Sequence, residues 1–268
     1  MTVDPWQRAI GFIRALDERA AEQVVPFRWG RALINHRLQL VHDLNYLIVN
    51  RVDGADVEAL AAEANRIQGE AGVAHRRINV DDQAAADRFA PAFIAAGYRP
   101  ERFVVMVHRR PPDRPVDTSG VREIDWMQLR PARERELRQQ PWASAPGLVS
   151  QILAKHELTA SRINTRYFGA LADGGVVSSC ELRTENGVAQ IETVETLEPF
   201  RRRGLSRAVV SAALEAARGY AFVFLVADAN DWPQTFYRRL GFDEVGIESR
   251  FLRLLDSSGS RDFPRVYA

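Results

Sequence analysis

The segment 191–206, with the sequence IETVETLEPFRRRGLS, contains residue types that could bind an anion. Alternating side chains predict a strand at its start, and Pro199 would end that strand because proline cannot donate to a sheet ladder. Three arginines at 201–203 offer positive charge and hydrogen-bond donors, and Gly204 lets the backbone approach a ligand closely. A helix is predicted from Leu205, and its free first-turn amides and positive dipole end favour a phosphate.

A second motif, NDWPQTFYRRLGF at residues 230–242, follows the apolar run AFVFLVAD. Such a run indicates a buried strand. Asn230 stands at the end of the run, and Tyr237 follows it by seven residues on a predicted helix. Gly241 comes four residues after the tyrosine and precedes an aromatic residue.

In this order the two motifs resemble the GNAT superfamily of acetyl-CoA-dependent N-acetyltransferases, whose pyrophosphate loop reads R/Q-x-x-G-x-G/A. Residues 201–206 fill that frame, with Ser206 where the family usually has Gly or Ala, and the family's proline is displaced by one residue to Pro199. The resemblance covers about residues 120–255. It implies an α/β (α+β) fold with a mixed, mostly antiparallel central sheet flanked by helices.

The N-terminal half carries a pattern similar to the second motif. Aligning Gly97 and the following tyrosine with Gly241 and the following phenylalanine makes residues 82–109 a repeat of helix, glycine, aromatic residue and strand. Phe93 then falls where Tyr237 stands, and a phenyl ring has no proton to give. This half also lacks an Arg-x-x-Gly loop before its helix. The alternative is a coincidence of two ordinary helix–strand units.

We therefore predict a duplicated fold. Residues 1–115 would form a degenerate GNAT-like domain that binds no acetyl-CoA and shapes the substrate side or the interface between the halves. The proline-rich segment 111–120 is the best candidate linker, and residues 120–268 would form the acetyl-CoA-binding domain. Such a chain would be a monomer with pseudo-dimeric halves or a homodimer.

Periodicity predicts the other elements. An amphipathic helix is expected over residues 4–22, and further helical segments over 126–141 and 147–158. Pro131 and Pro141 are expected to interrupt or end these segments. Three antiparallel strands should precede the arginine loop, joined by hairpin turns at Asp-Gly-Gly (173–175) and Glu-Asn-Gly (185–187).

The resemblance also implies roles for the residues of the two motifs. Backbone groups around 194–196 would hold the pantetheine arm and the acetyl carbonyl, and amides of 202–206 the pyrophosphate. Tyr237 would donate a proton to the departing sulfur, although it could instead be a buried aromatic residue. Asn230 could bind the cofactor arm or cap a helix. The predicted cofactor-binding residues are Val194, Glu195, Thr196, Arg201, Arg202, Arg203, Gly204, Leu205, Ser206 and Asn230.

An ammonium substrate needs a base that removes its proton before attack. Glu192 is our candidate, because strand alternation predicts that Glu192 and Glu195 cannot both face the site. A water chain is the alternative. The five histidines show no metal-ligand spacing and are assigned no chemistry, so no metal is expected. Cys180 is the only cysteine, which excludes an intrachain disulfide, and it is expected to pack within a strand.

Composition limits the remaining possibilities. A net charge of +1 and no basic stripe argue against nucleic acid as the main partner. No apolar run approaches the roughly 20 residues that cross a bilayer, and no signal peptide is recognised, so we expect a cytoplasmic protein without a membrane partner. A nucleotide-binding protein is disfavoured because neither GxGxxG nor a Walker motif is present.

The sequence therefore predicts an N-acetyltransferase. It would transfer an acetyl group from acetyl-CoA to a primary amine by direct attack in a ternary complex, with a small-molecule or peptide acceptor that stays open. The alternative is a non-catalytic acyl-CoA-binding or interaction module.

Overall fold

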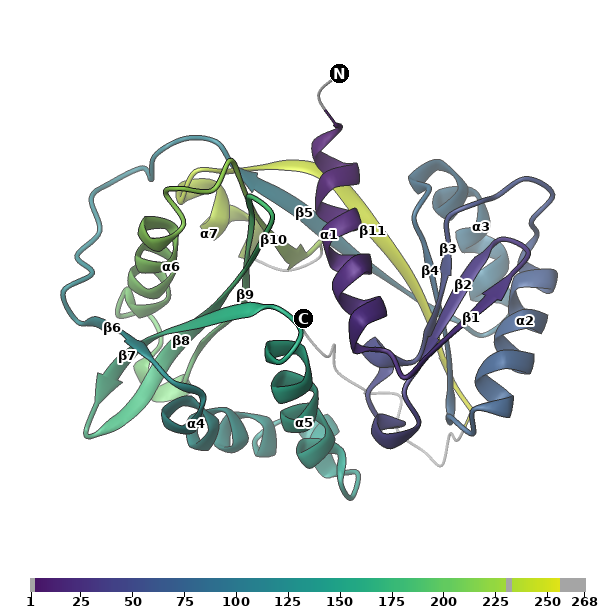
Figure 1. Ribbon diagram of the computed structural model, residues 1–268, viewed down its shortest axis with the longest axis horizontal. Helices are drawn as coiled ribbons and strands as arrows, with labels where there is room; N and C mark the ends of the chain where they lie inside the picture. The colour runs from purple at the N-terminus through teal and green to yellow at the C-terminus, as the bar shows by residue number, and fades with distance from the viewer. Residues whose placement is uncertain (1–2, 230–232, 256–268) are drawn as a thin grey trace.

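The computed structural model describes residues 3–229 and 233–255, which build one 11-stranded sheet with helices on both faces (Figure 1). The helices are α1 (Pro5–Ala20), α2 (Val57–Glu70), α3 (Gln83–Ala95), α4 (Trp126–Arg138), α5 (Leu148–Ala160), α6 (Leu205–Ala216) and α7 (Pro233–Arg239). The strands are β1 (Gln23–Phe27), β2 (Gly30–Ile34), β3 (Tyr46–Val49), β4 (His75–Val80), β5 (Arg99–His108), β6 (Val121–Ile124), β7 (Asn164–Ala172), β8 (Gly175–Glu185), β9 (Val188–Thr196), β10 (Phe222–Asp228) and β11 (Phe242–Leu254). Short 3-10 turns lie at η1 (His36–Leu38), η2 (His42–Leu44), η3 (Pro141–Ser144) and η4 (Glu198–Phe200).

The two halves of the chain contribute their elements in the same order. β1, β2, β3, α2, β4, α3 and β5 in the first half correspond to β7, β8, β9, α6, β10, α7 and β11 in the second. In both halves the third and fourth of these strands are parallel, and the hairpins before them are antiparallel.

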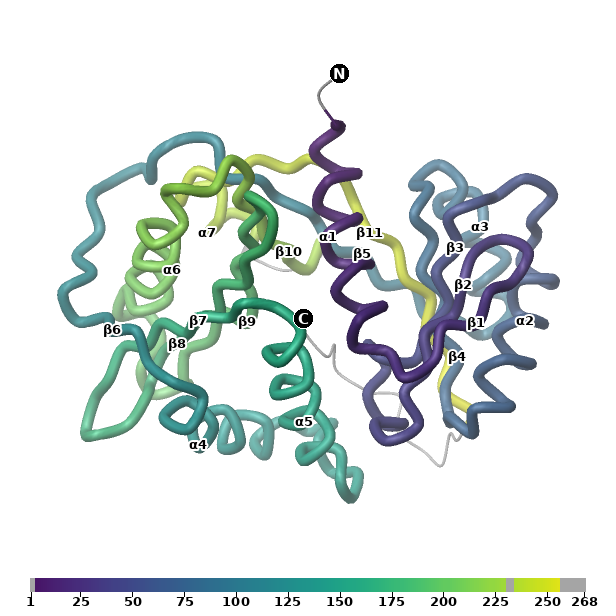
Figure 2. Tube along the Cα trace, in the orientation of Figure 1, coloured from purple at the N-terminus to yellow at the C-terminus, as the bar shows by residue number. Residues whose placement is uncertain are grey.

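The last strand of each half lies among the strands of the other half. The sheet order is β1-β2-β3-β4-β11-β5-β10-β9-β8-β7-β6, so β11 pairs with β4 and β5 pairs with β10, both antiparallel. The long β11 crosses from the C-terminal half to the N-terminal half beside β5 (Figure 2). The division into domains at 115–120 stays a prediction, and the exchanged strands make the sheet continuous across that division.

Side chains of β5 alternate between the two faces of the sheet. Val104 and Met106 join the core beneath α6 and α7, whereas Val105 and Val107 pack with Ala9 of α1. On the first face α2 and α3 cover the N-terminal half, and α6 and α7 cover the C-terminal half. The second face carries α1 at the centre, with α4 and α5 toward the C-terminal half. This second face holds the polar side chains described below.

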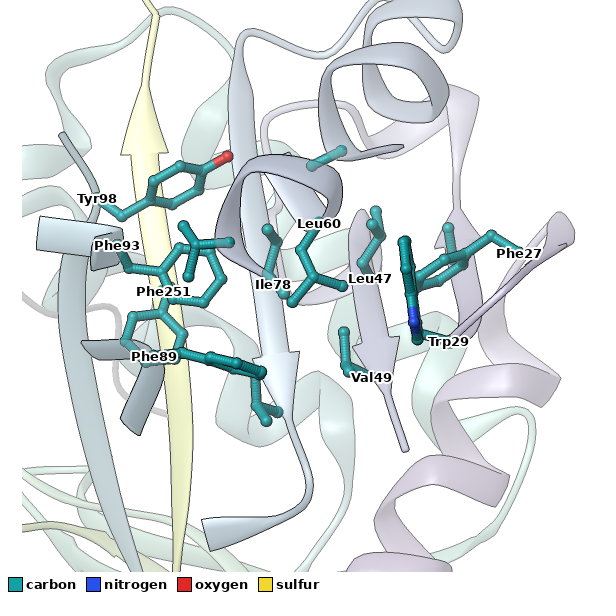
Figure 3. Close-up of a cluster of buried hydrophobic side chains, with 14 of the residues drawn as sticks. Phe27, Trp29, Leu47, Val49, Leu60, Ile78, Phe89, Phe93, Tyr98 and Phe251 are labelled. Carbon is teal, nitrogen blue, oxygen red and sulfur yellow. The ribbon is translucent and has the colours of Figure 1, made fainter. Parts of the chain in front are cut away.

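The core of the N-terminal half is rich in aromatic rings (Figure 3). Phe93 of α3 is fully buried and stacks on Phe251 of β11, with 4.2 Å between ring centroids. Tyr98 meets Phe93 edge to face at 5.2 Å. Because Phe251 comes from the exchanged strand, the C-terminal half contributes to this core.

Local predictions are mostly confirmed. The helix expected over 4–22 is α1, and Asp173 and Asn186 adopt positive φ in their hairpin turns (51° and 48°). One expectation is wrong, because Pro131 does not interrupt the helix but lies inside α4. A capping box between Asp125 and Gln128 stabilises the first turn and offsets the one backbone hydrogen bond that a proline removes. None of the helices in the described ranges is long and apolar enough to cross a membrane.

Candidate active site

Strands β9 and β10 separate where the predicted site lies. Their parallel pairing ends at Ile191 and Leu225, although β9 continues to Thr196 along β8. A bulge in β9 accompanies the separation, because Glu192 pairs with Glu181 while the next pairs recorded are those of residues 195 and 196. Thr193 in this bulge has φ 52°, an uncommon value for a β-branched residue. The backbone of 193–196 therefore leaves the ladder with β10 and borders an opening.

The arginine loop closes this opening at the start of α6. Arg202 and Gly204 both have positive φ, 61° and 80°. Gly204 is the N-cap residue of α6 and provides no side-chain cap, so the first-turn amides of the helix stay available. The Thr196 and Ser206 hydroxyls lie 2.7 Å apart, and Arg201 Nε donates to the Thr196 carbonyl at 3.2 Å. These bonds hold the loop against the end of β9.

A cavity of about 1040 Å³ runs from this loop across the second face of the sheet toward the N-terminal half. Most of the predicted site residues line it: Glu192, Val194, Glu195, Thr196, Arg201, Arg202, Gly204, Leu205, Ser206 and Tyr237. Arg203 is turned away, with its guanidinium over the Phe200 ring and bonded to the Pro199 carbonyl at 2.9 Å. Asn230 lies outside the described residues.

Tyr237 projects from α7 into the cavity and is 8 % exposed. Its ring meets Phe242 edge to face at 6.0 Å. Burial, followed by Cys180 and Glu192, raises the pKa of Tyr237 above its ordinary value. The phenol is therefore protonated at neutral pH and can act as a hydrogen-bond donor. Cys180 is fully buried in β8, as predicted.

Both candidate glutamates line the cavity, which corrects the prediction that only one could face it. Strand alternation fails because the bulge at Thr193 inserts an extra residue between them. Glu195 forms an ion pair with Arg133 of α4. Glu192 is 6 % exposed and accepts from Gln190 Nε2 at 3.0 Å, and in the described part of the chain no cation lies within ion-pair distance of it.

A buried polar cluster beside Glu192 was not anticipated from the sequence. Glu181 Oε1 lies 2.9 Å from His156 Nδ1, and Glu181 Oε2 accepts from Arg183 at 2.6 and 3.1 Å. Burial alone would raise the pKa of Glu181, but Arg183 and His156 hold it well below its ordinary value. Burial lowers the pKa of His156 to about 4, so its ring is neutral near pH 7. The available signal was a pair of charged residues, at 181 and 183, with the two-residue spacing that places them on one face of a strand.

The far wall of the cavity comes from the N-terminal half together with α4, η3 and α5 of the C-terminal half. Tyr46 of β3 donates to Asp17 of α1 at 2.5 Å, and Lys155 of α5 donates to Asp43 of η2 at 2.9 Å. Apolar side chains fill the rest of this wall: Leu16, Val41, Leu44, Leu137, Trp142 and Ile152. No group of three or more potential metal ligands occurs in residues 3–229 and 233–255.

Comparisons with known proteins agree with this geometry. Residues 121–242 match the family model described as acetyltransferase (GNAT) family. No curated protein matches the chain.

Solved structures share the fold at low sequence identity. A protein of unknown function from Staphylococcus epidermidis aligns with a TM-score of 0.65 and 12 % identity, over 87 % of this chain and 94 % of that one. A GCN5-related N-acetyltransferase from Kribbella flavida aligns with a TM-score of 0.60 and 16 % identity, over 97 % of each chain. A tandem GNAT protein from the clavulanic acid biosynthesis pathway aligns with a TM-score of 0.54 and 15 % identity, over 79 % of this chain and 76 % of that one.

Proposed function

We propose that this chain is a GNAT-type N-acetyltransferase that transfers an acetyl group from acetyl-CoA to a primary amine of a small molecule, as the family match over residues 121–242 supports. One observation carries the proposal: the cavity that begins at the uncapped first turn of α6 also contains Tyr237 and a buried glutamate without an ion-pair partner among the described residues. Donor-binding groups and proton-handling groups thus share one continuous space.

The residues of the loop fit a pyrophosphate. Amides of 202–206 and the dipole of α6 offer hydrogen bonds and positive potential, and Arg201 and Arg202 add charge beside them. The backbone of β9 at 193–196 no longer pairs with β10 and would hold the pantetheine arm and the acetyl carbonyl. Arg203 would contribute by shaping the loop, because its side chain bonds Pro199.

When bound, the thioester supplies an acetyl group that a neutral amine can attack directly. Glu192 would accept the ammonium proton, since no ion pair within the described residues competes for its carboxylate. Tyr237 would donate a hydrogen bond to the sulfur as the thiolate leaves, because burial keeps its phenol protonated. Holding both substrates in one cavity can lower the barrier by about 7–11 kcal/mol when the geometry is ideal.

We assign the N-terminal half the role of acceptor wall. Its residues Asp17, Asp43 and Tyr46 line the cavity opposite the arginine loop. Helix α5 is fixed to this half because Gln151 Oε1 accepts from the Leu40 amide at 2.9 Å, in addition to the Lys155–Asp43 bond. A cavity of about 1040 Å³ has the size of a small-molecule site, which favours a small amine over a protein surface as the acceptor.

The first test is donor binding followed by turnover. Acetyl-CoA at about a hundred times its dissociation constant should stabilise the fold by about 2.7 kcal/mol, visible as an upward shift in the thermal midpoint. A panel of small amines is then assayed by release of free thiol. A melt unchanged by acetyl-CoA would contradict the proposal.

Tyr237→Phe tests the chemistry separately. The variant should lose about 10²–10⁴-fold in kcat while keeping its affinity for acetyl-CoA, because only the proton donor is removed. Tyr98→Phe is the matched control, since Tyr98 is also buried beside an aromatic ring but its hydroxyl has no hydrogen-bond partner in the described structure. Equal kcat values for the two variants would exclude Tyr237 as the donor.

A further inference from the structure

The start of the segment that joins the two halves is bound to the helices around the donor loop. We call residues 109–114 the strap. The amides of Arg109 and Asp113 donate to the carbonyls of Gly241 and Arg239, both at or just after the end of α7, at 2.9 and 2.8 Å. A Cβ atom on Gly241 would lie 1.8 Å from the Arg110 carbonyl oxygen, so glycine is required for this approach.

The strap also contacts α6. Arg207 Nη1 donates to Asp113 Oδ1 at 2.6 Å, and the Arg207 side chain is 10 % exposed. Arg114, the next residue of the strap, lines the same cavity as the arginine loop, and so does Arg239 of α7. The hydrogen bond from Arg207, together with the charges of Arg207, Arg114 and Arg239, lowers the pKa of Asp113. Three guanidinium groups from three elements therefore gather around one carboxylate at the loop end of the cavity.

Among residues 3–229 and 233–255, the positive charge of this cluster is only partly neutralised. Arg114, Arg207 and Arg239 bring three positive charges, and Asp113 neutralises one of them. A phosphate monoester carries about −1.5 to −2 at neutral pH, which matches the remaining charge. A pyrophosphate bound at the first turn of α6 would leave these arginines for a second anion.

We propose that Arg114 and Arg239 form a subsite for a phosphate monoester, occupied by the 3′-phosphate of coenzyme A. The inference rests on the proposed function, because it assumes that the pyrophosphate lies at the arginine loop. Arg207 is a positioning residue, since its bond to Asp113 holds the strap beside the loop. The segment between the halves is thus part of the donor site as well as a connection.

The experiment compares acetyl-CoA with 3′-dephospho-acetyl-CoA by isothermal titration, without any acceptor amine. The unmodified chain should bind the dephosphorylated donor at least about tenfold more weakly, the value of a charge-assisted hydrogen bond to phosphate. Arg114→Gln should weaken acetyl-CoA by a similar factor and leave the dephosphorylated donor unchanged. Arg109→Gln is the control, since Arg109 is an exposed strap residue that does not line the cavity.

The outcomes separate the two proposals. Binding of both donors with equal affinity would overturn the subsite while leaving the proposed function intact, and so would a loss in Arg114→Gln that is equal for both donors. Binding of neither donor would overturn the proposed function itself. The subsite could instead bind a phosphate group of the acceptor, which would also overturn the proposal. In that case the two donors would bind equally, and inorganic phosphate would raise the thermal midpoint of the wild type but not that of Arg114→Gln.

Discussion

Helices α2 and α6 hold equivalent places in the two halves, but their first turns differ. Asp56 caps α2, and its Oδ1 accepts from the Ala59 amide at 2.8 Å. Gly204 at the start of α6 provides no side chain, and the residues before it supply three arginines instead. A carboxylate therefore occupies one helix N-terminus, whereas the other is open to an anionic ligand.

The helices that follow show the same contrast. Phe93 of α3 is fully buried and stacked on Phe251, so aromatic rings fill its surroundings. Tyr237 of α7 stands at the corresponding place and lines the cavity. In both halves this side chain meets an aromatic ring that follows a glycine, Tyr98 or Phe242, edge to face. The same topology thus supports a packed core in one half and a ligand cavity in the other, and the side chains at a few positions decide which.

The largest effect on stability should come from removing a buried ring from the core of the N-terminal half. Phe93→Ala is expected to lower the free energy of unfolding by about 3–5 kcal/mol, because it leaves a cavity beside Phe251. Urea unfolding measures the loss. Phe93→Leu, which keeps most of the volume, should cost clearly less. A loss below about 1 kcal/mol in the alanine variant would mean that the N-terminal core is not packed as described.

Placing an aspartate at the N-cap of α6, as in α2, should weaken donor binding. Gly204→Asp is expected to weaken acetyl-CoA binding by about 100-fold, because a carboxylate would occupy the amides and repel the pyrophosphate. No atom lies within 4 Å of a Cβ at this position, and Asp tolerates positive φ. Gly204→Asn serves as the uncharged control and should bind more tightly than the aspartate variant. Equal affinities would show that charge at this turn is unimportant.

Each half also holds a histidine, His42 half-buried and His156 buried, that should make the fold sensitive to acid. Burial lowers the pKa of both His42 and His156 to about 4, against 6.5 for an ordinary histidine. The unfolded chain binds the proton first as pH falls, so stability is lost between pH 6.5 and 4, by about 2 kcal/mol per histidine from pH 7 to 5.

Urea unfolding at pH 7 and pH 5 measures this loss. His156→Gln and His42→Gln should each reduce the difference between the two pH values by about 2 kcal/mol. If neither variant changes the difference, the histidines are not buried in their neutral form in solution.

The smallest effect is expected at the cap of α2. Asp56→Ala should lower the free energy of unfolding by about 1 kcal/mol and leave acetyl-CoA affinity unchanged, because we propose that the donor binds at α6 and not at this helix N-terminus. Thermal melts with and without acetyl-CoA measure both quantities. A change in donor affinity would show that the N-terminal half takes part in donor binding directly.

The sequence alone determined the features that depend on near neighbours along the chain. Hairpin turns follow from residues that accept positive φ, and the start of α6 follows from Gly204 and the helical pattern after it. Spacing around Tyr237 and the arginine loop predicted the GNAT family, and the model of that family matches residues 121–242. The repeat of elements was also readable, because helix, glycine, aromatic residue and strand recur in order.

Only the tertiary structure decided how distant segments combine. The bulge at Thr193 turns Glu192 and Glu195 into the same cavity, and a period-two pattern contains no signal for one extra residue. The exchange of β5 and β11, the strap on α7 and the acceptor wall around Asp17 join residues far apart in the sequence. Such contacts depend on the total burial and pairing of the whole chain, since no local propensity favours one distant partner over another.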